Sequence, residues 1–169
     1  LAAALGVLVA LPLLPARSIA AVELNVLDQV SAPTALLFAG FPGCATVCPT
    51  TLSVMDRARD LASAQTALVF INIQRDAHPG AVRRYVEQFA PDVVTASIDD
   101  RSAKPLMRAL GIRGFDSQRA ASTHRGDIYV LVQREQRWQV ADVLHTTPSP
   151  EMLAALVDAS NESGPAEVW

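Results

Sequence analysis

The residues best suited to chemistry are the two cysteines of the chain, Cys44 and Cys48, which lie four positions apart and are followed by Pro49. An apolar run over residues 35–39 precedes them, and a pattern typical of a helix follows. We therefore predict a buried strand, a Gly/Pro turn and a helix start, with both sulfurs at the turn. Unpaired N–H groups and the positive end of a helix dipole favour the thiolate form of cysteine.

Two thiols at this spacing have three uses. A structural disulfide between Cys44 and Cys48 would close a very short loop and stabilise the fold little. Thiol-disulfide exchange is a second use, in which Cys44 would attack a partner disulfide and Cys48 would resolve the mixed disulfide. The common redox motif, however, has two intervening residues and not three. A metal site is the third, because residues four apart share one side of a helical turn and soft thiolates favour copper(I) or zinc.

The elements that must position these cysteines alternate between strands and helices. The predicted order is β-α-β-α-β-α-β-β-α, which indicates a parallel core with an antiparallel hairpin at its edge. We predict an α/β thioredoxin-like fold, in which helices flank a central mixed sheet and a β-hairpin and a helix close the chain. The predicted strands are 34–39, 67–73, 93–97, 127–132 and 137–144, after a short edge strand over 22–27; the predicted helices are about 49–63, 77–90, 102–110 and 150–159.

A metal site would need a further ligand, most naturally an imidazole, and the chain has three histidines. His78, at a helix start, and His145, at a strand end, are interpreted as surface or capping residues. His124 lies in a polar segment three residues before Asp127, where a buried strand is predicted to begin. In a thioredoxin-like sheet this segment runs beside the cysteine loop, but its position alone does not make His124 a ligand.

Length and composition indicate one globular domain. The chain has 169 residues, half of them hydrophobic and 18% charged, with a net charge of −3. It can bury a sizeable core, and it lacks the basic footprint of a nucleic-acid-binding protein. We expect a folded domain over residues 21–160 and a loose tail over 161–169.

The first twenty residues are strongly apolar, with small residues at Ser18 and Ala20. They are interpreted as the end of a secretory signal peptide or, alternatively, as an N-terminal membrane anchor. Either reading predicts an exported protein, in the periplasm or anchored to the outer face of the cytoplasmic membrane.

The segment from Cys44 to Leu52 resembles the cysteine motif of the Sco/SenC family of copper proteins, C-P-x-x-C-P followed by a helix. The family's later D-P-x-R-D motif has its counterpart at residues 72–76, which read Asn-Ile-Gln-Arg-Asp. A histidine just before a strand completes the pattern, as His124 does here. Ala45 replaces the first motif proline and leaves the three candidate ligands unchanged.

The resemblance implies that one copper ion, Cu(I) or Cu(II), is bound by Cys44, Cys48 and His124, with Arg75 and Asp76 shaping the floor and charge of the site. It also implies a role in assembling the dicopper site of cytochrome c oxidase, by delivering copper or by reducing target cysteines. The partner would be the oxidase subunit that carries that site, or another copper or thiol protein. The alternative is that the protein is an exported thiol-disulfide oxidoreductase that acts on cysteines of a partner protein. Its enzymatic activity would then be thiol-disulfide reduction.

Overall fold

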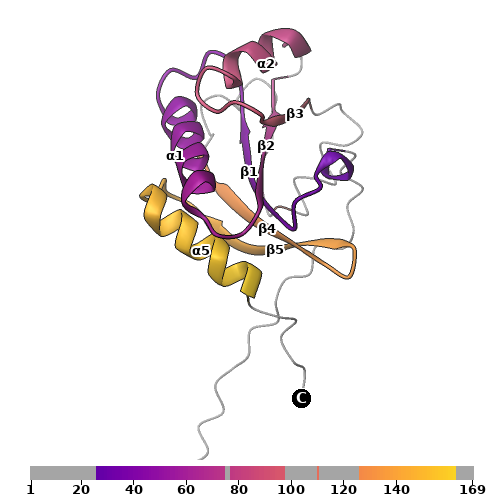
Figure 1. Ribbon diagram of the computed structural model, residues 1–169. Coiled ribbons are helices and arrows are strands. Elements are labelled where there is room, and N and C mark those ends of the chain that lie inside the picture. The colour runs from indigo at the N-terminus through magenta and orange to yellow at the C-terminus, as the bar shows by residue number, and fades with distance from the viewer. Residues whose placement is uncertain (1–25, 75–76, 98–109, 111–125, 163–169) are drawn as a thin grey trace, which may run out of the picture.

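A five-stranded mixed sheet forms the centre of the computed structural model, which describes residues 26–74, 77–97, 110 and 126–162 (Figure 1). The spatial order is β3-β2-β1-β4-β5. The first three strands pair in parallel, and β4 and β5 add antiparallel pairs. The strands are β1 (Thr34–Gly40), β2 (Thr66–Asn72), β3 (Val94–Ser97), β4 (Ile128–Arg134) and β5 (Arg137–Leu144).

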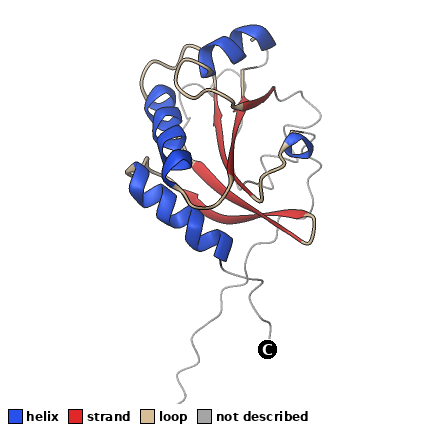
Figure 2. Cartoon of the chain, viewed as in Figure 1, coloured by secondary structure: helices blue, strands red, loops and turns tan. Residues whose placement is uncertain are grey.

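Helices cover one face of this sheet. Helices α1 (Val47–Leu61) and α5 (Pro150–Glu162) lie side by side along it, and the short 3-10 helix η1 (Leu27–Gln29) lies on the opposite side (Figure 2). Helix α2 (Pro79–Val86) packs with the α1 face through buried valines. The predicted thioredoxin-like α/β fold, with its closing hairpin and helix, is confirmed in the described part of the chain.

The central strand β1 is buried at all seven positions because both sheet faces are covered. Leu36 and Phe38 point into the cluster beneath α1, α2 and α5. Ala35, Leu37 and Ala39 point into a second cluster that includes η1. A continuous apolar run is the pattern expected of such a doubly covered strand, and it fixes the strand that leads into the cysteine loop.

Several element boundaries differ from those predicted. Leu27 begins η1 and is not part of an edge strand, while residues 22–25 lie outside the described part. Helix α2 ends at Val86, because Pro91 cannot continue a helix and the residues before it form turns. Helix α5 extends to Glu162. The predicted helix over 102–110 lies outside the described residues except for Leu110, which is buried.

The ends of the hairpin and of α1 are fixed by specific contacts. Glu135 and Gln136 both have positive φ, as a tight two-residue hairpin turn requires. The Asp158 carboxylate of α5 accepts the Ser63 and Ala64 N–H groups just after α1, at 3.1 and 2.9 Å. These two bonds join the C-terminal ends of α1 and α5.

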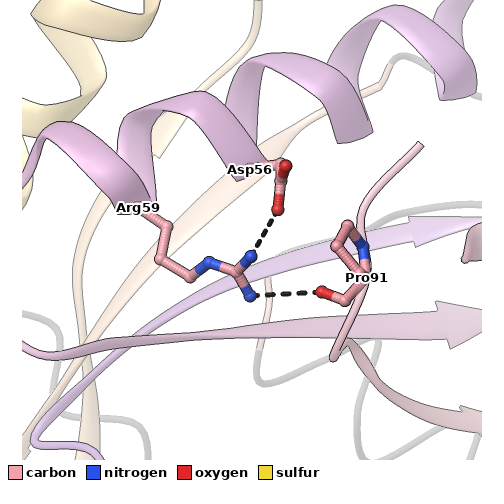
Figure 3. Close-up of polar contacts among 3 residues, drawn as sticks. All are labelled: Asp56, Arg59 and Pro91. Atoms are coloured by element: carbon pink, nitrogen blue, oxygen red, sulfur yellow. Dashed lines mark hydrogen bonds and ion pairs between the residues drawn. The ribbon is translucent and has the colours of Figure 1, made fainter.

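Arg59 ties α1 to the segment before β3 (Figure 3). Its Nη1 donates to the Pro91 carbonyl oxygen at 3.2 Å, and its Nη2 donates to Asp56 Oδ1 at 2.5 Å. Burial raises the pKa of Asp56, and the nearby Arg59 guanidinium opposes that rise. One guanidinium thus satisfies a backbone carbonyl and a partly buried carboxylate.

In the described part of the chain, none of the helices combines the length and the apolar character that a membrane span requires.

Candidate metal centre

The cysteine loop leaves the sheet at the C-terminal end of its central strand. β1 ends at Gly40, which is in register with Asn72 of β2, and α1 begins seven positions later at Val47. Gly43 adopts a φ of +91°, which L side chains rarely adopt, so the turn favours glycine there. The loop therefore stands at the sheet edge where neighbouring parallel strands also end, a common place for a site in α/β folds.

Gly40 leaves the space that Cys48 fills. A Cβ at position 40 would lie 3.0 Å from Cys48 Sγ and 2.9 Å from ring atoms of both Phe38 and Phe70. Cys48 and both rings are fully buried. The second sulfur is consequently held in the core by rigid neighbours.

Cys44 takes the place of a side-chain cap at the start of α1. The N-cap residue, Thr46, makes no side-chain capping bond, whereas the Cys48 N–H donates to Cys44 Sγ at 3.4 Å. The helix begins two residues earlier than predicted, so Cys48 lies within its first turn. The first sulfur is therefore placed directly at the positive end of the α1 dipole.

The two thiols have opposite electrostatic environments. Burial raises the pKa of Cys44, but hydrogen bonds from Cys48, Thr46 and Val47 outweigh it and hold that pKa below its ordinary value. Burial, with a further contribution from the Cys44 sulfur, raises the pKa of Cys48 to about 12. No disulfide joins Cys44 and Cys48, and Cys44 is only half-buried. The pair thus combines an accessible, activated thiol with a buried, protonated one.

Tyr85 of α2 lies near both cysteines, which its place in the predicted helix over 77–90 did not reveal. Its hydroxyl donates to the Cys44 carbonyl oxygen at 2.6 Å, and its ring packs against the core cluster that contains Cys48. Burial and the two nearby sulfurs raise the pKa of Tyr85, so the hydroxyl keeps its proton. A half-buried tyrosine needs a hydrogen-bond partner for its hydroxyl. This need is the feature that could have indicated the contact from the sequence.

The other predicted site residues, His124, Arg75 and Asp76, lie outside the described part of the chain. Gly126 marks how near the described chain comes to the loop, because a Cβ on Gly126 would overlap the Val47 side chain. Among the described residues, no group of three or more His, Cys, Asp and Glu side chains could hold a metal ion. The structure therefore places Cys44 and Cys48 together, and the third ligand remains a prediction.

The remaining two histidines have structural contacts. His78 is exposed and caps α2, with its Nδ1 accepting the Gly80 N–H at 3.1 Å. The His145 side chain is 68% exposed, and its Nδ1 lies 3.2 Å from Asp127 Oδ1. Both contacts match the interpretation of these histidines as surface and capping residues.

The mixed sheet, with a cysteine pair where its central strand meets a helix, defines a thioredoxin-like protein. The SCO1/SenC family model matches residues 27–159, and the chain belongs to that family. A comparison with curated protein sequences finds no significant match.

Solved structures with the same fold include three copper-bound Sco proteins. Yeast Sco1 with copper bound is 16% identical, with a TM-score of 0.62, over 84% of this chain and 86% of its own. Arabidopsis thaliana ScoI with copper bound is 15% identical, with a TM-score of 0.60, over 79% and 86%. Bradyrhizobium japonicum ScoI with copper bound is 20% identical, with a TM-score of 0.56, over 79% and 88%.

Proposed function

We propose that this protein binds one copper ion through Cys44, Cys48 and His124. The observation that carries the proposal is the pairing of the two thiols at the N-terminus of α1, where the Cys48 N–H donates to Cys44 Sγ at 3.4 Å. Soft thiolates suit copper(I), and the helix terminus stabilises the negative charge that they carry as ligands. Family membership and the copper bound in the yeast and plant Sco structures support the choice of metal.

The position of His124 in the sequence is compatible with this ligand set. Gly126 lies against Val47, the first residue of α1 after the cysteine loop, and His124 is two residues away along the chain. Two residues of extended chain span at most about 7 Å. The chain between Gly126 and position 124 is thus short enough for an imidazole at 124 to reach the cysteine loop.

The two thiols have different parts in loading and release. Cys48 holds its proton in the free protein, so copper binding must release that proton and will be favoured at higher pH. Cys44 is half-buried and is open to exchange with a thiolate of an acceptor protein. Copper would leave by stepwise exchange of thiolate ligands.

The acceptor that we propose is a protein with a copper site built from cysteines, namely the subunit carrying the dicopper site of cytochrome c oxidase. We also propose that the protein is exported and works in the periplasm or at the outer face of the cytoplasmic membrane. The apolar residues 1–20 and the family membership support this assignment.

The test is a copper(I) titration of the reduced full chain against a coloured copper(I) chelator. We expect one ion per chain, and His124→Ala should weaken binding at least about 100-fold, because changes even to outer partners of metal ligands cost 10–100-fold. His145→Ala is the matched control and should bind like the parent. Equal affinities of parent and His124→Ala would remove His124 from the ligand set, and no binding by the parent would remove copper.

The asymmetry of the thiols favours a second function, reduction of a disulfide in a partner protein. The Cys44 thiolate would attack the partner disulfide, forming a mixed disulfide and releasing one partner thiolate. Cys48, after giving up its proton, would then attack Cys44 and release the second, so that two electrons pass to the partner. Reduction of a model peptide disulfide by the parent but not by Cys44→Ala would support this activity, whereas equal rates would exclude it.

A further inference from the structure

We propose that Tyr85 is a positioning residue that holds Cys44 and Cys48 in the paired arrangement a metal ion needs. The inference rests on the proposed copper site for its metal-binding consequence. Its second consequence, for the dithiol-disulfide equilibrium, does not depend on copper.

The geometry for this role comes from the Tyr85 hydroxyl and from the packing of its ring. Tyr85 donates to the carbonyl oxygen of Cys44 at 2.6 Å, which fixes the peptide group immediately after the first ligand. The tyrosine ring packs against the core cluster that contains Cys48. A single side chain of α2 thus joins the backbone of one cysteine to the packing around the other.

The tyrosine ring is itself held in place. Tyr85 packs edge-on against Phe89, with ring centroids 5.4 Å apart and planes at 69°. Both rings pack against the core cluster that contains Cys48. The helix that carries Tyr85 is capped by His78. Because its support is rigid, the hydroxyl can restrain the loop and does not simply follow it.

This restraint should favour the dithiol over the disulfide. Disulfide formation must bring the two sulfurs to about 2 Å of each other, whereas they are non-bonded here. The bond to the Cys44 carbonyl oxygen holds the backbone of the first cysteine in the position of the dithiol form. Loss of the Tyr85 hydroxyl should therefore weaken copper(I) binding and make the disulfide easier to form.

The test compares Tyr85→Phe with Tyr129→Phe, which loses the only other tyrosine hydroxyl of the chain. Tyr129 is a matched control because it is buried in the cluster on the opposite face of the sheet from Cys48. For Tyr85→Phe we expect about tenfold weaker copper(I) binding, the effect of one lost hydrogen bond of average strength. In glutathione redox buffers, the disulfide should be favoured about tenfold, a potential about 30 mV more negative for two electrons.

The two readouts separate this inference from the copper proposal. If the parent binds no copper, the copper proposal fails, and the redox equilibrium alone decides the role of Tyr85. A shift of that equilibrium in Tyr85→Phe but not in Tyr129→Phe supports the positioning role. Parent-like equilibria in both variants, or equal shifts in both, would overturn it.

Discussion

An added side chain at Gly40 would crowd Cys48 directly, so Gly40→Ala is the most informative stability variant. The added methyl would lie 2.9 Å from two phenylalanine rings and 3.0 Å from Cys48 Sγ. Both rings are fully buried and lie in contact, with centroids 6.0 Å apart, so neither can turn away freely. Overpacking of this kind costs about 1–3 kcal/mol, and with three crowded neighbours we expect about 2 kcal/mol.

The assay is urea unfolding of four proteins: the parent, Gly40→Ala, Cys48→Ala and the double variant. Because Cys48→Ala removes one of the three crowded atoms, Gly40→Ala should cost about 0.5–1 kcal/mol less in that background, a coupling typical of residues in contact. A cost below about 0.5 kcal/mol for Gly40→Ala, the range of ordinary surface substitutions, would refute the packing argument. An equal cost in both backgrounds would show that Cys48 Sγ is not one of the atoms in the way.

Three further predictions concern α1, α5 and the thiols. Arg59→Ala should lower the free energy of unfolding by about 1–2 kcal/mol in urea, because it leaves a backbone carbonyl and a partly buried carboxylate without their donor. Asp158→Asn should cost about 1 kcal/mol at pH 7, since the carboxylate accepts two backbone N–H groups. Those bonds lower the pKa of Asp158, so this loss should be fully present above about pH 4, the usual range of an unfolded Asp, and should vanish as the pH falls through the folded pKa. Iodoacetamide at pH 7 should label Cys44 before Cys48, as read by peptide mass spectrometry, because burial raises the pKa of Cys48 to about 12.

Each of these predictions has its own control. Arg57→Ala, on an exposed position of the same helix, should change stability by less than about 0.5 kcal/mol; equal losses for both arginines would contradict the role of Arg59. If the loss of stability in Asp158→Asn did not depend on pH, the negative charge of the carboxylate would not be what stabilises its bonds to the Ser63 and Ala64 N–H groups. Equal labelling of the two cysteines in the folded protein, and not only in urea, would contradict their different environments.

Local sequence patterns predicted the fold because each of them is typical of one kind of structural element. The short unbroken apolar run of β1, bounded by a Gly/Pro segment, is typical of a strand covered on both faces and followed by a turn. The hairpin turn falls between the predicted strands 127–132 and 137–144, although its two positive-φ residues, Glu135 and Gln136, are not the usual glycine or asparagine. The boundary errors at η1 and α2 arose where short-range turns compete with regular structure.

The site was only partly predictable because its contacts join distant segments. The spacing of Cys44 and Cys48 gave the thiol pair and its helix, but not which sulfur is buried. That difference depends on Gly40, whose missing side chain makes room for Cys48. The Tyr85 contact joins residues 41 positions apart, and the sequence pattern could place that tyrosine only on a predicted helix.

The most direct measurement of the central claim is copper K-edge X-ray absorption on the copper(I) complex of the full chain. The proposed site predicts two sulfur neighbours and one nitrogen neighbour around the metal, with the sulfur contribution lost in the Cys44→Ala, Cys48→Ala double variant. A parent spectrum fitted by nitrogen and oxygen alone, or one unchanged in the double variant, would contradict copper binding by this cysteine pair.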